Sequence, residues 1–175
     1  MAMDEQTDPE LVEACRDGNR GAYAELVRRH QDSVFGLAMG MTRNREDAAD
    51  MAQDAFIRAY NKLEQYNPEY SFRSWILRIC ANLTKNLFRK RVRRRDVEER
   101  HRMETEVEQS EVDPDFQALE EALAQLPPKL GVPLRLKYME GLPYEEISQI
   151  LGIGVSAAKM RVLRAKNQLA EVLKP

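Results

Sequence analysis

The segment from Ser71 to Arg95 combines side chains that suit single-stranded nucleic acid. Residues three or four apart share one face of a helix. On such a helix an apolar stripe is formed by Phe72, Ile76, Ile79, Cys80, Leu83 and Leu87. A nearly opposite row is formed by Arg78, Asn82, Lys85 and Arg89, with Trp75 at its border. Because bases stack on aromatic rings and phosphates pair with cations, this row predicts a single-strand binding surface.

The end of the same helix is strongly basic. Six of the seven residues from Arg89 to Arg95 are Lys or Arg. Cations at a helix C-terminus complement the helix dipole, which offers a purely structural interpretation. Six cations exceed what a dipole requires, so the composition favours a nucleic-acid partner.

A second pattern lies on the helix expected for residues 46–63. One side carries the apolar and mostly small side chains of Ala48, Ala52, Ala55, Phe56, Ala59 and Leu63. The other side carries Asp47, Asp50 and Asp54, with Gln53 and Ile57 beside them. Acids in the first turn complement the positive end of a helix, although Asp54 lies two turns in. A docking face for a basic partner is equally consistent with these residues, and the pattern alone leaves both interpretations open.

The segment from Tyr144 to Leu163 matches the helix-turn-helix template, with Gly152 at the turn and a second helix from Val155. The exposed side of that second helix is expected to be cationic. Ser156, Ala157 and Met160 are predicted to lie nearest to base edges. Arg161 and Arg164 are predicted to lie nearest to base edges or phosphates of the same duplex DNA.

Helical periodicity dominates the chain, and no long alternation typical of a strand is present. We therefore predict an all-α protein of two small helical domains joined by an acidic flexible linker. The expected boundaries are 1–95 for the first domain, 96–113 for the linker and 114–175 for the second domain. In the first domain, Asp8 is expected to cap a short helix that has Pro9 at its first position.

Charge is strongly segregated along the 175 residues. Residues 1–95 hold 17 Lys or Arg and 14 Asp or Glu, residues 96–121 hold 2 and 11, and residues 122–175 hold 8 and 4. The formal net charge of −2 therefore arises from one acidic segment between two mildly basic blocks. An overall negative charge is no argument against nucleic-acid binding by either block.

Several function classes are not supported by the residues. The chain shows no nucleophile–base pair, phosphate-binding loop or cluster of metal ligands, so we expect neither an enzyme nor a cofactor or metal site. Cys15 and Cys80 lack metal-ligand spacing and are expected in the core. The acidic N-terminus and the absence of a long apolar run predict a cytoplasmic protein without membrane insertion.

Four segments together resemble bacterial sigma factors of the extracytoplasmic-function class. They are AYAELVRRHQDSVFGLA at 22–38, DAADMAQDAFIRAYNKL at 47–63, FRSWILRICANLTKNLFRKRVRR at 72–94 and YEEISQILGIGVSAAKMRVLRAKNQL at 144–169. They follow the order and spacing of that family. The resemblance implies a transcription initiation factor that binds core RNA polymerase and promoter DNA, with a promoter-melting domain and a helix-turn-helix domain.

The resemblance also implies roles for individual residues. Docking on the β′ coiled coil of the polymerase, which also involves its β subunit, is implied for Asp47, Asp50, Gln53, Asp54 and Ile57. Recognition and opening of the −10 element is implied for Tyr66, Trp75, Arg78, Asn82, Lys85, Asn86 and Arg89. Binding in the −35 major groove is implied for Ser156, Lys159, Met160, Arg161 and Arg164. Members of the family are commonly inhibited by an anti-sigma factor, so we expect one here.

The recognition helix departs from the family pattern. Where relatives often read VGTVKSR, this chain reads VSAAKMR from Val155 to Arg161 and so lacks the Thr and the Ser of that pattern, which could donate hydrogen bonds. The −35 preference is therefore expected to differ. The alternative function is an operator-binding helix-turn-helix regulator, which gives no role to Trp75 and Asn82. A decoy that mimics the fold is a further alternative, but it would not need two basic surfaces.

Overall fold

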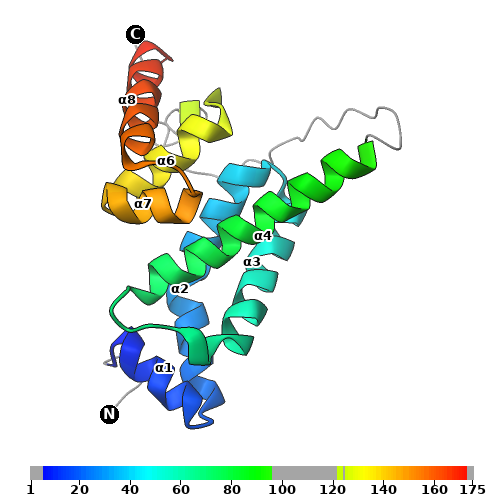
Figure 1. The fold of residues 1–175 in the computed structure, drawn as a ribbon, viewed down its shortest axis with the longest axis vertical. Helices are drawn as coiled ribbons and strands as arrows, with labels where there is room; N and C mark the ends of the chain where they lie inside the picture. The colour runs from blue at the N-terminus through cyan, green and yellow to red at the C-terminus, as the bar shows by residue number, and fades with distance from the viewer. Residues whose placement is uncertain (1–5, 96–121, 124, 173–175) are drawn as a thin grey trace, which may run out of the picture. The chain divides into compact units, whose positions relative to one another are not determined.

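The computed structural model describes residues 6–95, 122–123 and 125–172 of the chain. The chain divides into two compact units, residues 1–90 and 91–175 (Figure 1). All regular structure in the described residues is helical, which confirms the prediction of an all-α protein with two helical domains. The predicted linker at 96–113 and the predicted start of the second domain at 114 lie outside the described residues.

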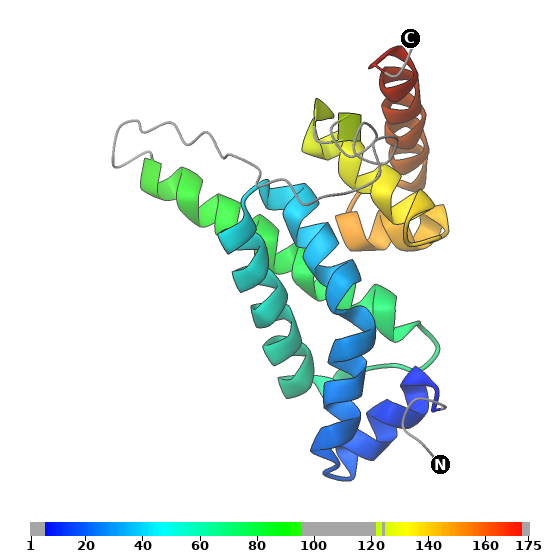
Figure 2. The same cartoon turned by 180° about the vertical axis from the view of Figure 1, so that it is seen from behind.

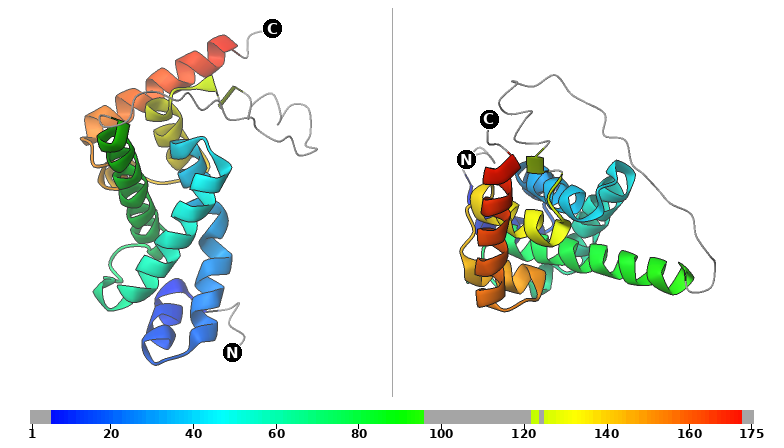
Figure 3. Two further views of the ribbon diagram at one scale, coloured as in Figure 1. Left: turned by 90° about the vertical axis from the view of Figure 1, so that its right-hand side faces the viewer. Right: turned by 90° about the horizontal axis from the view of Figure 1, so that it is seen from above.

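The first unit is a helical bundle. Its elements are α1 (Asp8–Arg16), α2 (Arg20–Thr42), α3 (Arg45–Asn61), the short 3-10 helix η2 (Leu63–Gln65) and α4 (Phe72–Arg95). Helices α2 and α3 run side by side in opposite directions, and α4 crosses them (Figures 1 and 2). The right panel of Figure 3 shows α4 extending past the other helices of the bundle.

Local sequence signals explain where these helices begin and end. The Asn19 side chain accepts hydrogen bonds from the first backbone N–H groups of α2, and Asn44 does the same for α3, as expected of N-cap residues. Arg43 ends α2 in the left-handed conformation, with φ of 55°. The Ser71 hydroxyl accepts a hydrogen bond from the Ser74 backbone N–H at the start of α4.

Helix α4 buries a different stripe from the predicted one. Phe72, Ile76 and Cys80 are buried as expected, but Ile79, Leu83 and Leu87 are only half-buried. The buried side is completed by Leu77, Ala81 and Thr84. The Thr84 hydroxyl donates to the carbonyl oxygen of Cys80 at 2.9 Å, so this buried polar group is satisfied within the helix.

Helix α1 is capped by Thr7, so the prediction that Asp8 caps it is wrong. The Thr7 backbone N–H donates to the Glu10 carboxylate at 2.7 Å, and the Thr7 hydroxyl donates to it at 2.8 Å. These hydrogen bonds lower the pKa of Glu10. Asp8 is left free to make long-range contacts instead.

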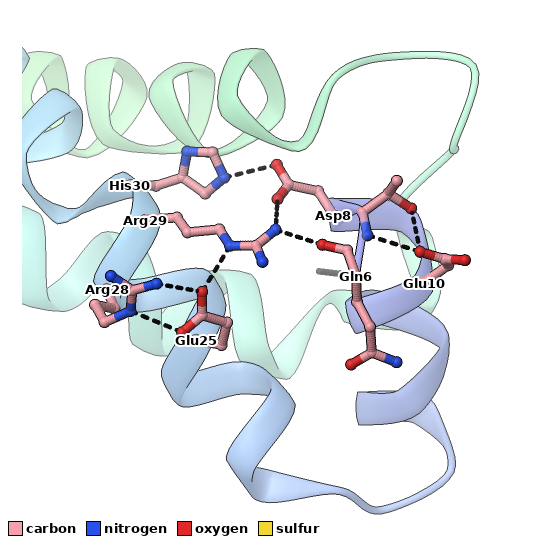
Figure 4. Close-up of polar contacts among 8 residues, drawn as sticks. Gln6, Asp8, Glu10, Glu25, Arg28, Arg29 and His30 are labelled. Atoms are coloured by element: carbon pink, nitrogen blue, oxygen red, sulfur yellow. Dashed lines mark hydrogen bonds and ion pairs between the residues drawn. The ribbon is translucent and has the colours of Figure 1, made fainter. Parts of the chain in front are cut away.

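Asp8 ties α1 to α2 through His30 and Arg29 (Figure 4). The Asp8 carboxylate lies 2.7 Å from Nε2 of the buried His30 and 3.3 Å from the Arg29 guanidinium. Arg29 also donates to the Gln6 carbonyl and to Glu25, each at 2.7 Å. Burial opposes ionisation of Asp8, but its contacts with His30 and Arg29 hold its pKa below the ordinary value.

The tautomer of His30 follows from its surroundings. A carboxylate can only accept, so Nε2 carries the hydrogen that faces Asp8. The opposite nitrogen, Nδ1, is buried without a hydrogen-bond partner.

The second unit packs α6 (Pro128–Tyr138) and α7 (Tyr144–Leu151) against α8 (Val155–Val172). Its core holds Leu126, Leu130, Leu134, Val162 and Ala165. Gly152 ends α7 with φ of 61°, so the predicted turn glycine adopts the left-handed conformation that glycine favours. Helices α7 and α8 thus form the predicted helix-turn-helix (Figure 3).

The Asp8 network predicts a specific pH dependence of stability. Because folding lowers the pKa of Asp8 from 3.8, its contribution is present above that value and is lost as pH falls through the folded pKa. Asp8→Asn should lower the free energy of unfolding by about 1–3 kcal/mol near neutral pH. The difference from the unmodified protein should shrink as pH falls below 3.8 and through the folded pKa of Asp8, as measured by urea unfolding. Asp17→Asn, at an exposed position, is the control, and a difference that stayed constant with pH would contradict this role.

Candidate functional site

The outward face of α4 carries the predicted polar row. Arg78, Asn82, Asn86 and Arg89 are exposed and follow one another at intervals of three or four residues. Lys85 is half-buried beside them. Burial lowers the pKa of Lys85, and the nearby charge of Arg89 lowers it further. The helix therefore presents amide and cationic groups together on one side.

Trp75 stands at the edge of this row within an aromatic cluster. Its ring centre lies 5.4 Å from that of Tyr66 and 5.6 Å from that of Phe72. Phe72 in turn contacts the His30 ring at 5.4 Å. The indole is half-buried, so the cluster holds it in place while leaving part of its surface exposed.

Tyr66, which is predicted to contact the −10 element, is buried in the structure. Tyr66 is only 4% exposed, and burial raises its pKa. Its hydroxyl donates to the carbonyl oxygen of Tyr70 at 2.7 Å. The ring is thus enclosed by the protein, and its contacts shape the loop that precedes α4.

Helix α1 also supports this loop. The Arg16 guanidinium donates to the carbonyl oxygens of Leu63 and Tyr66 at 2.9 and 3.0 Å. The loop turns outward after Tyr66, and the Tyr70 side chain is 55% exposed. Tyr70 is therefore a further candidate DNA contact, which the sequence did not reveal because only burial distinguishes Tyr70 from Tyr66.

The predicted docking residues lie on the outer side of α3. Asp50, Gln53, Asp54 and Ile57 are exposed, whereas Asp47 is half-buried near the helix start. Of these, Gln53 and Ile57 line a groove of about 920 Å³ between α2 and α3. Tyr23, Phe35, Phe56 and Tyr60 supply aromatic surface to the same groove. An acidic edge therefore borders an apolar groove.

The predicted −35 residues lie on α8. Ser156, Lys159, Met160 and Arg164 are exposed, and Arg161 is half-buried. Ala158, Val162 and Ala165 face the core of the unit. The exposed side of the second helix of the helix-turn-helix is thus free to enter a groove of DNA.

Two family models match the chain. The model of sigma-70 region 2 matches residues 26–94, which include α3 and most of α4. The model of sigma-70 region 4 matches residues 116–169, which include α6 and α7 and most of α8.

Curated relatives align along nearly the whole chain. The ECF RNA polymerase sigma-E factor of Haemophilus influenzae is 31% identical over 185 residues, which cover 97% of this chain and 96% of that protein. The chain belongs to the extracytoplasmic-function (ECF) sigma factors. The sigma-E factor of Escherichia coli is 31% identical over 188 residues, covering 99% of this chain and 98% of that protein. The sigma factor SigE of Mycolicibacterium smegmatis is 34% identical, covering 97% of this chain and 69% of that protein.

Solved structures share the fold. The sigma factor RpoE of Bartonella quintana, in complex with the anti-sigma factor NepR, matches with a TM-score of 0.76 at 23% identity, covering 86% of this chain and 96% of that chain. CnrH, in complex with the cytosolic domain of CnrY, matches with a TM-score of 0.67 at 25% identity, covering 95% of this chain and 96% of that chain.

As an ECF sigma factor, the protein is a non-enzymatic transcription initiation factor that acts with RNA polymerase on promoter DNA. The alternative of an operator-binding regulator is not favoured, since that class would not match region 2. Among the described helices, none has the length and hydropathy needed to cross a membrane.

The buried hydroxyl of Tyr66 generates a stability prediction. Tyr66→Phe should lower the free energy of unfolding by about 1 kcal/mol, because the hydrogen bond to the Tyr70 carbonyl is lost. Tyr70→Phe removes a hydroxyl from an exposed ring and should change it by less than about 0.5 kcal/mol. Urea unfolding followed by circular dichroism measures both. Equal effects of the two substitutions would show that the Tyr66 hydroxyl does not support the loop.

Proposed function

We propose that the sigma factor divides promoter recognition between its two units. The outward face of α4 recognises and opens the −10 element, α8 lies in the −35 major groove, and the outer side of α3 docks on core RNA polymerase. The domain boundaries proposed are 1–95, 96–113 for the linker and 114–175. The chemistry of the three surfaces, amide and cationic on α4, cationic on α8 and acidic on α3, supports this division.

The observation that carries the −10 assignment is the outward row of α4 beside a fixed indole. Unpairing and unstacking a base costs a few kcal/mol. Stacking on an aromatic side chain contributes about 1–3 kcal/mol per base, so Trp75 and the exposed Tyr70 can offset that cost. Asn82 and Asn86 offer donors and acceptors for an unpaired base edge, while Arg78, Lys85 and Arg89 offer positive charge to the backbone.

The fixed position of the Trp75 indole favours binding of the opened strand over binding of the duplex. The aromatic cluster of Tyr66, Phe72 and Trp75 fixes the indole before DNA arrives. A side chain that is already ordered loses little conformational entropy on binding. The binding free energy is therefore available to separate the strands, and the factor melts DNA without covalent chemistry.

Docking on core polymerase is proposed for the acidic edge and groove of α3. The occupant we propose is the β′ coiled coil, with a further contact from the β subunit. Asp50 and Asp54 are exposed acids that attract a basic surface, and Asp47 extends the same edge. Gln53 and Ile57 line the adjoining groove, where apolar contact can exclude water.

An anti-sigma factor is the remaining partner we propose. The similar structure of CnrH contains a cytosolic partner domain, which supports a protein inhibitor for this chain as well. We propose that the sigma factor works in the cytoplasm, because that is where bacterial RNA polymerase acts.

The docking proposal is tested by charge reversal. Asp54→Arg should weaken co-purification with core RNA polymerase about tenfold or more at moderate salt, because a like charge then faces the basic partner. Asp17→Arg reverses an exposed acid at the end of α1 and should leave co-purification unchanged. Helical content measured by circular dichroism should be the same for both variants. Retained co-purification of Asp54→Arg would rule out the docking role of α3.

The melting proposal is tested on α4. Asn82→Ala should lower open-complex formation roughly fivefold to tenfold, because hydrogen bonds to an unpaired base are lost. Permanganate footprinting of unpaired thymines measures this, while binding of the same holoenzyme to −35 duplex DNA serves as the control and should not change. An unchanged yield of open complex would refute the assignment of α4.

A further inference from the structure

Two apolar side chains occupy the exposed side of α8 where it is expected to face DNA. Met160 is 48% exposed and Leu163 is 50% exposed. They are three residues apart, so they lie next to each other on one face of the helix. Ser156 and Asn167, both exposed, extend the same face toward the two ends.

Cations border this apolar pair on both sides. At about 100° per residue, Lys159 and Lys166 fall on one edge of the exposed face and Arg164 on the other. The Lys159 ammonium lies 5.7 Å from the ring centre of Tyr144, and that of Lys166 lies 5.6 Å from the ring centre of Tyr138. These ring contacts draw both lysines toward one edge and away from the apolar centre.

The pattern fits a DNA groove better than an apolar protein surface. From Val155 to Val172 the helix holds four Lys or Arg and a single acid, Glu171. The two strands that border a major groove place phosphates on both sides of an inserted helix. Cations at both edges can pair with those phosphates, and the apolar pair is then directed at base edges.

We propose that Met160 and Leu163 read the C5-methyl groups of thymines in the −35 element, a specificity that rests on the proposed placement of α8 in that groove. Thymine is the base whose major-groove edge carries a methyl group. Its burial against the flexible Met160 thioether and the Leu163 side chain removes apolar surface from water. Leu163 was not among the residues expected from the sequence.

Discrimination between base pairs arises from the cost of covering polar base edges as well as from the attraction of the thymine methyl group. Guanine presents two acceptors in the major groove, and cytosine presents an amino donor. Neither Met160 nor Leu163 can satisfy these groups, and a polar group that loses water without gaining a partner weakens binding. The apolar pair therefore disfavours G·C pairs at the positions it covers.

The test removes single methyl groups from the DNA. The full chain, assembled with bacterial core RNA polymerase, selects −35 sequences from a duplex library randomised in that region. Each thymine of the selected element is then replaced by deoxyuridine, which deletes one methyl and changes no hydrogen-bonding group. At one or more positions the Kd should rise roughly fourfold, the factor expected for burial of one methyl group. The double variant Met160→Ala/Leu163→Ala should bind the thymine and deoxyuridine duplexes equally, whereas Met160→Leu should still distinguish them.

Met139→Ala is the matched control, because Met139 is a comparably exposed methionine, 44%, at the end of α6. It should keep the full preference for thymine. Selected elements without thymine, deoxyuridine duplexes bound as tightly as thymine duplexes, or a preference that survives the double variant Met160→Ala/Leu163→Ala would each overturn the inference. In all three cases enrichment of a −35 sequence would still uphold the placement of α8. Absence of any −35 enrichment would instead contradict the proposed function, and the inference with it.

Discussion

The surfaces of the first unit depend on one constraint, which is the side of α4 that is packed into the core. Its buried side is fixed by Phe72, Ile76 and Leu77, by the small Ala81, and by Thr84, whose hydroxyl is satisfied by the carbonyl of Cys80. A slip of one residue would turn the helix by about 100° and bring charged side chains of the outer row toward the interior. Burying such charges without partners is strongly unfavourable. The packing of the interior therefore decides which side chains can face DNA.

Helical periodicity was sufficient to predict the outward row but not the buried side. Counting large apolar residues favoured Ile79, Leu83 and Leu87, which are only half-buried. Small or polar residues at helix crossings, such as Ala81 and Thr84, carry little weight in such a count although close packing requires them. The outer row was predicted well because it lies opposite the predicted apolar stripe and also opposite the side of α4 that is buried in the structure. The helix-turn-helix was predictable for a different reason, since its turn needs a residue such as Gly152 that tolerates positive φ.

Contacts between distant parts of the chain account for what the sequence did not reveal. Asp8 reads locally as a helix cap, yet its carboxylate binds His30 and Arg29, more than twenty residues away. In the sequence, Tyr66 lies in a loop and nothing nearby indicates that it is buried. In the structure its ring packs against Phe72 and Trp75. Local patterns state which groups are available, and tertiary packing decides which of them are used internally. Tyr66 is buried by such contacts, whereas Tyr70 in the same loop stays exposed.

Opposite charges must also be kept apart on a small bundle. The first unit carries acids on α3 and cations on α4, and in the part of the chain that the structure describes neither Asp50 nor Asp54 forms an ion pair with α4. Both helices turn these residues outward and pack their other sides into the common core. A helix with its side chains is about 10–12 Å across, and the screening length is about 8 Å at physiological ionic strength. Each face can therefore attract its own partner with little cancellation by the other, which a uniformly mixed surface of the same net charge could not do.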